Sequence, residues 1–219
     1  KMEQLPLDIA GAPSFARDDL VITKANQTAI ELVDGWPQWP APVVVLVGPI
    51  GAGKTHVAQA WAQISGAQTI AAKDLFAEDF TTNVSTPILV EDPDRTKINE
   101  TALFHLINLV RQSQQTLLVT SRAWPSAWGV SLPDLQSRLR AATLIELFEP
   151  DDELLAGVFY KLIADRQMQV DEATIRYLVT HTERSLESAS RLVTLLDEAA
   201  LSQKRPVTRR FAAEVIAAM

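Results

Sequence analysis

The chain has 219 residues, no cysteine and a formal net charge of −7. The lack of cysteine excludes disulfides and thiolate metal sites, and the acidic balance argues against a protein whose main task is to bind bare nucleic acid. Hydrophobic residues make up 47% and charged residues 21%, an ordinary globular composition, and no apolar run is long enough to span a membrane, so we expect no membrane association.

Taken in chain order, the first elements are an arm, a helix and a strand. Residues 1–19 show no helical or strand period and are expected to form an N-terminal arm. Residues 24–34 place apolar side chains at helical spacing, and the proline-containing stretch 35–40 ends that helix. The run Val43–Val47 is continuously β-branched or leucine, which is typical of a strand buried on both faces of a parallel sheet. A glycine-rich loop and a helix over 56–64 follow.

The same strand–loop–helix order recurs further along the chain. Strands are predicted at 69–72, 88–91, 116–120 and 143–147, with a helix at 99–112. This alternation predicts an α/β domain over residues 20–150, with a parallel sheet and right-handed crossovers. After Pro150, helices are predicted without strands between them, at 151–167, 172–181, 185–202 and 209–218. The sequence therefore predicts a small all-helical lid domain over residues 151–219.

The glycine-rich loop has the phosphate-binding pattern G-x-x-x-x-G-K-[ST]. It consists of Gly48, Pro49, Ile50, Gly51, Ala52, Gly53, Lys54 and Thr55, with His56 next in the following helix. Glycines let backbone N–H groups approach a phosphate, and the helix N-terminus adds its positive end. Lys54 would bridge the β- and γ-phosphates, and the Thr55 hydroxyl would ligate Mg²⁺. We therefore expect ADP or ATP with Mg²⁺, whereas the alternative is a glycine turn that binds nothing.

An acidic strand end forms a second candidate part of the site. The predicted strand Ile88–Val90 runs into Glu91 and Asp92 beside the loop. Glu91 is expected to hold Mg²⁺ through water and Asp92 to orient the attacking water, or Asp92 takes over the metal-side role. The alternative is a strand end with two solvated acids.

These motifs together resemble the DnaA family of AAA+ proteins. The loop Gly48–His56 is similar to the family's phosphate loop, Leu117–Pro125 to its sensor 1 strand and Leu132–Leu139 to its box VII segment, L-x-S-R. The helices over 150–219 are similar to its lid, so the resemblance covers residues 20–219. The chain stops at Met219, without the helix-turn-helix domain that follows the lid in DnaA, and this favours the Hda-type regulators within the family.

The resemblance implies a role for an arginine and for two sensor positions. Arg138 matches the arginine finger, which would complete the nucleotide site of an ATP-bound DnaA partner, with Arg140 as the nearby competitor. Thr120 and Ser121 would supply the polar contact of sensor 1, because Arg122 stands where DnaA has an acidic residue. The sensor 2 arginine aligns with Glu187, flanked by Arg184 and Arg191, and a one-turn substitute is conceivable. Glu187 at the position of the sensor 2 arginine and the Glu–Asp order at 91–92 both argue against turnover of ATP by the protein itself.

The arm resembles the Q-L-x-L peptide that docks on the replicative sliding clamp, the DNA polymerase III beta subunit. Gln4 would make polar contacts, while Leu5, Leu7 and Ile9 would enter an apolar groove. The alternative is an arm that packs its leucines on its own domain. DNA would then be reached only indirectly, through the clamp.

Val21 and Ile22 match the family's adenine contacts, although simple core packing is an equal alternative. The resemblance as a whole implies a cytoplasmic bacterial protein of the replisome that docks on the clamp and stimulates hydrolysis of DnaA-bound ATP, with homo-oligomers possible. The alternatives are an autonomous DnaA-like ATPase acting as a loader or anchor, and a small-molecule P-loop kinase. The outward L-x-S-R segment and the helical tail argue against the kinase.

Overall fold

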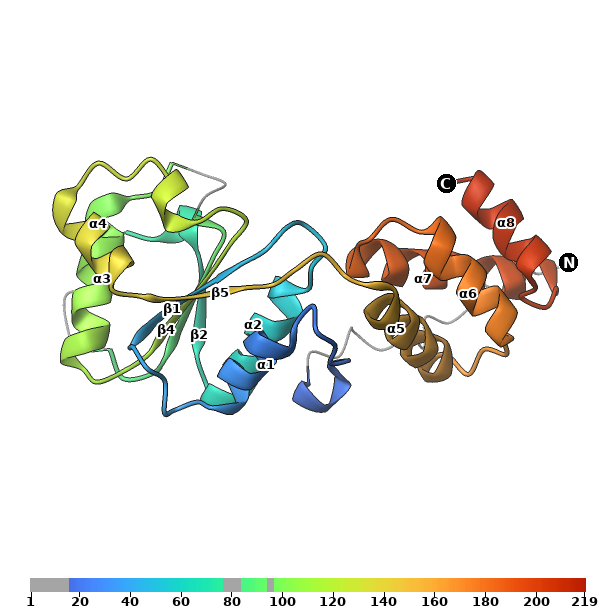
Figure 1. The fold of residues 1–219 in the computed structure, drawn as a ribbon, viewed down its shortest axis with the longest axis horizontal. Helices are drawn as coiled ribbons and strands as arrows, with labels where there is room; N and C mark the ends of the chain where they lie inside the picture. The colour runs from blue at the N-terminus through green and yellow to red at the C-terminus, as the bar shows by residue number, and fades with distance from the viewer. Residues whose placement is uncertain (1–15, 77–83, 94–96) are drawn as a thin grey trace, which may run out of the picture.

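The structure is a computed structural model that describes residues 16–76, 84–93 and 97–219. It has a parallel sheet covered by helices and, beyond it, a group of four helices that we call the lid (Figure 1). The strands are β1 (Val43–Val47), β2 (Gln68–Ala71), β3 (Ile88–Glu91), β4 (Leu117–Ser121) and β5 (Thr143–Glu146).

All strand pairs are parallel, in the order β2-β3-β4-β1-β5, so the predicted α/β fold is confirmed. Every residue of β1 and β4 is buried, as their continuous apolar runs predict. The edge strands β2 and β5 each leave residues exposed or half-buried. Because β2 lies at the edge of the sheet, its sequence lacks the continuous apolar run that β1 and β4 show.

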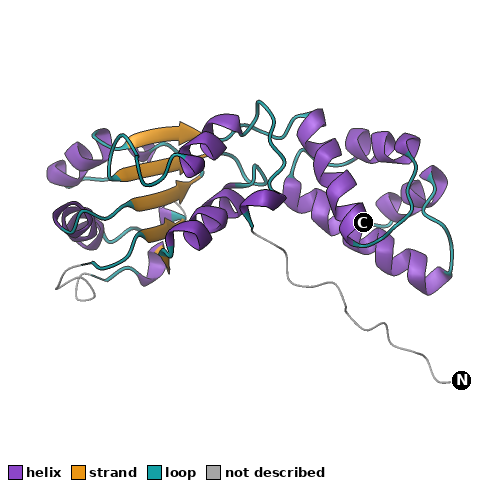
Figure 2. Cartoon of the chain, turned by 90° about the horizontal axis from the view of Figure 1, so that it is seen from below, coloured by secondary structure: helices purple, strands orange, loops and turns teal. Residues whose placement is uncertain are grey.

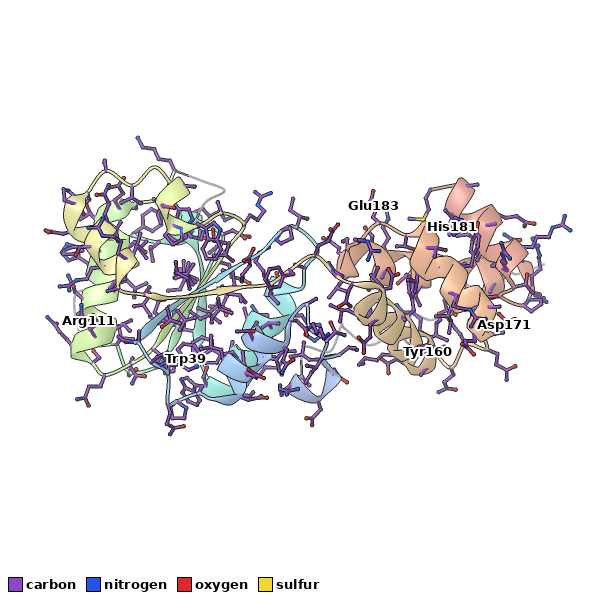
Figure 3. The ribbon with its side chains drawn as sticks, in the orientation of Figure 1. Trp39, Arg111, Tyr160, Asp171, His181 and Glu183 are labelled. Carbon is purple, nitrogen blue, oxygen red and sulfur yellow. The ribbon has the colours of Figure 1, made fainter. Side chains whose placement is uncertain are left out.

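Helices cover both faces of the sheet (Figure 2). They are α1 (Gln27–Asp34), α2 (Lys54–Ser65), α3 (Glu100–Gln112) and α4 (Pro133–Arg140), with 3-10 turns η1 (Arg17–Asp19), η2 (Ala72–Asp74) and η5 (Pro125–Ala127). Val43, Val45 and Val47 share one core with α3 and α4, whereas Val44 and Leu46 share another with α1 and α2. The residues of β1 alternate between the two cores because successive side chains of a strand point to opposite faces of the sheet. In the second core Trp61 is fully buried and stacks on Trp39, with ring centroids 5.1 Å apart (Trp39 labelled in Figure 3).

Two helix boundaries differ from the sequence prediction for local reasons. The first helix begins at Gln27 rather than at residue 24, because a turn precedes it: the Thr23 N–H donates to Asn26 Oδ1 at 2.9 Å, and Asn26 Nδ2 donates to the Val21 carbonyl at 2.7 Å. Helix α2 begins at Lys54 rather than at 56, directly after Gly53 in the left-handed region (φ 96°). Helix α4, with Pro133 in its first turn, was not predicted.

The lid consists of α5 (Asp152–Asp165), α6 (Glu172–His181), α7 (Leu186–Gln203) and α8 (Arg209–Ala217). These bounds confirm the four predicted helices to within two residues. Each helix has a side-chain cap at its start, from Asp151, Asp171, Ser185 and Thr208. The lid has a hydrophobic core of its own, which includes Phe159, Leu192 and Phe211. Among the described residues, no helix is both long and apolar enough to cross a membrane.

Candidate nucleotide-binding site

The carboxyl ends of three adjacent strands bring the predicted motifs together. Glu91 at the end of β3 pairs in register with Thr120 of β4, and the Asp92 N–H donates to the Thr120 carbonyl at 3.0 Å. On the other side of β4, the Gly48 N–H donates to the Ser121 carbonyl at 3.1 Å. The phosphate loop, the acidic pair and the sensor 1 position therefore lie at one edge of the sheet, as the sequence predicts for parallel strands.

The loop needs its glycines for two different reasons. Gly51 (φ 78°) and Gly53 (φ 96°) adopt left-handed backbone conformations, which side chains disfavour. Gly48 lies against β5's end instead, where a Cβ atom would stand 2.8 Å from the Leu147 carbonyl oxygen. The glycines at these positions let the loop turn sharply from β1 into α2, so that the loop lies at the N-terminus of this helix.

Lys54 and Thr55 occupy the first turn of α2. Lys54 is 9% exposed, and its ammonium donates to the carbonyls of Gly48 (2.6 Å) and Pro49 (2.9 Å). Thr55 is exposed. Lys54 and the exposed Thr55 thus lie at the start of α2, directly after the loop; to bridge phosphates, the Lys54 ammonium would have to exchange these carbonyl contacts for phosphate oxygens.

The acidic pair at the end of β3 includes the half-buried carboxylate of Glu91. Burial raises the pKa of Glu91, a hydrogen bond from Gln59 opposes this shift, and the charge of Asp92 adds to it. Asp92 itself has a left-handed backbone (φ 57°), so it turns the chain sharply away from the strand. In residues 16–76, 84–93 and 97–219, no three histidine, cysteine or carboxylate side chains cluster as metal ligands. A Mg²⁺ ion here would therefore need phosphate oxygens and water besides Thr55 and Glu91.

The two sensor 1 candidates have different surroundings. The Ser121 hydroxyl donates to the Ala123 carbonyl at 2.6 Å and accepts from Trp128 Nε1 at 3.0 Å. It therefore holds the loop after β4, and Thr120, in register with Glu91, is the better placed of the two for a polar contact. The sequence did not predict the hydrogen bond of Trp128 to Ser121, because only the fold brings the indole to this serine.

The residues expected on the adenine side lie where the N-terminal segment meets the lid. Val21 is half-buried against α5, where a Cβ on Gly157 would stand 2.6 Å from Val21 Cγ1, and Ile22 is 47% exposed. Val21 is thus at least partly a packing residue, while Ile22 offers apolar surface. His56 is half-buried in α2, and burial lowers its pKa, with the charges of Asp19 and Lys161 as smaller influences.

The lid packs directly on the phosphate loop, which the sequence did not predict. The Leu186 N–H donates to the Gly51 carbonyl at 2.8 Å. A Cβ on Gly51 would stand 2.2 Å from Ser185 Oγ, and one on Gly53 would stand 3.0 Å from Leu186 Cδ1. The first turn of α7 therefore covers the loop, and Glu187, the next residue, is exposed there.

The arginines that flank Glu187 have different positions. Arg184 donates to the Pro150 carbonyl (3.1 Å) and to Asp152 Oδ1 (2.7 Å), at the connection between β5 and α5. Arg191 is exposed one turn further along α7. Arg184 therefore contacts the connection to the lid, so Arg191 is the remaining candidate for a one-turn substitute.

Arg138 lies on α4, which Figure 1 places at the end of the α/β domain away from the lid. Its Nε donates to Asn108 Oδ1 of α3 at 3.2 Å, and the side chain is half-buried, whereas Arg140 is exposed. Arg138 therefore lies away from the lid, which packs on the chain's own phosphate loop. Gln4, Leu5, Leu7 and Ile9 fall outside the described residues.

Part of the chain matches a family model, and about half of it is similar to a curated relative. Residues 158–216 match the family model described as the Hda lid domain. An uncharacterised protein of Haemophilus influenzae is 33% identical over 118 residues, which are 53% of this chain and 51% of that protein. The chain thus matches about half the length of this curated relative.

Several solved structures share the fold. Domain III of the Thermotoga maritima replication initiation protein DnaA has a TM-score of 0.79 at 17% identity, covering 93% of this chain and 96% of that one. A replication initiator DnaA bound to AMPPCP and single-stranded DNA has a TM-score of 0.71 at 17% identity, covering 88% and 69%. The Thermotoga maritima RuvB Holliday junction branch migration motor has a TM-score of 0.73 at 15% identity, covering 94% and 73%. At these identities the likeness establishes the fold alone.

Proposed function

We propose that this chain is an AAA+ protein of the Hda/DnaA type, a nucleotide-holding regulator of replication initiation that acts on a DnaA partner. The observation that carries the proposal is the phosphate loop itself, with a lid of the Hda kind packed on it through the Leu186–Gly51 hydrogen bond of 2.8 Å. A loop with this cation, hydroxyl and glycine geometry is suited to ADP or ATP with Mg²⁺.

The proposed action on the partner is carried by Arg138. A guanidinium that neutralises charge developing on the γ-phosphate of another subunit accelerates hydrolysis by about 10³–10⁵-fold in known cases. The position of Arg138 on α4, away from the lid, supports a role in a neighbouring subunit's site, and its hydrogen bond to Asn108 would orient it. Glu187 in the first turn of α7 places a negative charge where the lid meets the loop, which fits weak turnover of the chain's own nucleotide.

Docking on the sliding clamp through Gln4, Leu5, Leu7 and Ile9 is part of the same proposal. Two or three buried aliphatic side chains contribute several kcal/mol, about 1.5–3 kcal/mol each, before the arm is ordered. DNA would be contacted indirectly through the clamp, and the protein would act in the cytoplasm with the replisome.

The test is ATP hydrolysis by DnaA with and without this protein, in the presence of DNA-loaded clamp. We expect stimulation that needs the clamp and is lost in Arg138→Ala. Arg111→Ala is the matched control, because Arg111 is an exposed arginine at the end of α3 (Figure 3) and should leave the stimulation unchanged. Absence of stimulation by a folded, nucleotide-bound protein would refute the proposed action on DnaA.

An autonomous ATPase is the second candidate; Lys54 and Thr55 in the first turn of α2, with Glu91 at the end of β3, support it. It predicts steady ATP turnover by the chain alone, lost in Lys54→Ala. Measured turnover without DnaA would favour this alternative over a purely regulatory role.

A further inference from the structure

A group of basic side chains lies at the end of the lid, around the start of α8. Residues 199–213 contain four basic side chains and no acidic one, although the whole chain has a formal net charge of −7. The four are exposed, and we call them the basic patch: Lys204, Arg205, Arg209 and Arg210. Figure 1 places α8 on the side of the lid away from the α/β domain. The basic patch is therefore separate from the phosphate loop.

One carboxylate holds two of these arginines side by side. Arg205 Nη1 lies 2.8 Å from Glu214 Oε2, and Arg210 Nε lies 3.3 Å from Glu214 Oε1. Arg205 also lies over the Phe211 ring, 4.8 Å from its centroid. The hydrogen bond from Arg205 is the main cause that lowers the pKa of Glu214, so this carboxylate stays ionised at neutral pH. Two guanidiniums thus share a single negative charge, and the patch as a whole stays positive.

Arg209 extends the basic patch toward α6. Its guanidinium lies over the Tyr177 ring, 5.1 Å from the centroid, and His181 stacks on the same ring with centroids 3.9 Å apart (His181 labelled in Figure 3). Tyr177 is half-buried. Because both neighbours engage this ring, it does not serve as a platform on which an unpaired base could stack. The patch therefore offers positive charge, which suits a phosphate backbone.

We propose that the basic patch is a surface for the phosphate backbone of duplex DNA. A guanidinium is a planar donor that matches phosphate oxygens. The three arginines are already held by Glu214 and by two aromatic rings, so less side-chain freedom is lost when they meet a phosphate. Binding of this kind is independent of sequence and depends on salt, because each neutralised phosphate releases condensed counterions. The acidic balance of the whole chain keeps the contact weak and confines it to the patch.

The contact goes beyond the proposed function, in which DNA is reached only through the clamp. A DNA-loaded clamp would hold the protein beside a duplex and raise the local concentration of DNA, so that a weak direct contact is sufficient. This use of the patch rests on the proposed docking on the clamp. The contact with DNA itself needs neither clamp, nucleotide nor DnaA, and it is therefore measurable with this chain alone.

The inference is tested by fluorescence anisotropy of a short labelled duplex of mixed sequence, titrated with the protein between about 50 and about 200 mM salt. We expect a dissociation constant on the order of 10⁻⁵ M at the lower salt, the same for unrelated sequences. Three neutralised phosphates predict a slope of about −2.7 for the logarithm of the binding constant against that of the salt concentration, which is an affinity loss of about 40-fold over this range.

Two variants of the patch have effects of opposite sign. Arg209→Gln/Arg210→Gln should reduce the steepness of the salt dependence by about 2 and weaken binding at the lower salt by at least about tenfold. Glu214→Gln removes the shared negative charge and should strengthen binding about 3-fold, the effect of one unit charge at about 6 Å in water. Loss of folding cannot produce both results. The matched control is Arg111→Gln/Lys73→Gln, the same change of charge at exposed residues of the α/β domain, and it should leave binding unchanged (Arg111 labelled in Figure 3).

The possible results decide the inference without reference to DnaA. Absence of salt-dependent binding by the wild type would overturn it, as would equal binding by Arg209→Gln/Arg210→Gln or equal weakening in the control. Sedimentation with vesicles of an anionic phospholipid is the counter-test: binding to vesicles through the patch, without binding to DNA, would assign it to a membrane surface instead. A wild type that binds DNA through the patch but does not stimulate DnaA would refute the proposed function and leave this inference standing.

Discussion

Replacing Gly51 by alanine tests the packing of the lid on the phosphate loop. Gly51 has φ 78°, and its new Cβ would stand 2.2 Å from Ser185 Oγ, 2.5 Å from Ser185 Cβ and 2.9 Å from Ser185 Cα. A non-glycine residue in the left-handed region costs about 1–2 kcal/mol. Because one of the contacts is to the backbone of Ser185, the first turn of α7 must move, and the Leu186–Gly51 hydrogen bond, about 0.5–1.5 kcal/mol, is lost with it. Together these effects destabilise the protein by about 1.5–3.5 kcal/mol.

The chain provides a control for the backbone effect alone. Gly129 has nearly the same conformation, φ 71°, but a Cβ there meets nothing within 4 Å. Gly129→Ala should therefore cost only the conformational part, about 1–2 kcal/mol. The difference between the two free energies of unfolding, measured by chemical denaturation, isolates the contact between the lid and the loop.

A rescue variant refines the same test. Ser185→Gly removes the two closest atoms facing position 51, at the cost of a few tenths of a kcal/mol for the weaker helix cap. In this background Gly51→Ala should be less destabilising than in the wild type. If Gly51→Ala and Gly129→Ala have equal effects, or if Ser185→Gly gives no rescue, then the first turn of α7 does not pack on the loop in solution.

Two further predictions concern stability. Asp171→Ala removes the side chain that caps α6 by accepting from the Thr174 N–H at 2.8 Å, so the free energy of unfolding should fall by about 1 kcal/mol in denaturation with urea, and an unchanged midpoint would contradict the cap. Burial lowers the pKa of His56 below its ordinary value of 6.5, with Asp19 and Lys161 as the neighbouring charges. The unfolded chain therefore takes up a proton more readily than the folded one as the pH falls from about 7 to about 5, so stability is lost on acidification. In His56→Gln this loss should be smaller, and identical pH profiles for the two proteins would show that His56 is not buried in its neutral form.

Local patterns in the sequence were sufficient for most of the fold and for the phosphate loop. The strands β1 and β4 are continuous apolar runs, and the lid helices have caps such as Asp171 and Ser185 directly before their apolar period. The loop pattern predicts its own conformation, because only glycine accepts the backbone of Gly51 and Gly53 without strain. The convergence of Glu91 and Thr120 also follows from sequence, since parallel strands end at the same edge.

Contacts between residues far apart in the sequence were decided by the tertiary structure alone, because spacing along the chain does not encode them. The packing of Ser185 on Gly51 joins residues that lie more than a hundred positions apart, and the hydrogen bond from Trp128 to Ser121 separates two sensor candidates that the sequence leaves equal. Arg184 stands three residues before Glu187 in the sequence, yet the direction of its side chain toward Pro150 and Asp152 depends on how α5 and α7 meet. The sequence by itself thus determined which groups the site contains, because backbone conformation and strand order are locally or topologically specified. The tertiary structure determined which of those groups can act together, because long-range contacts depend on how the faces of the lid and the sheet domain fit.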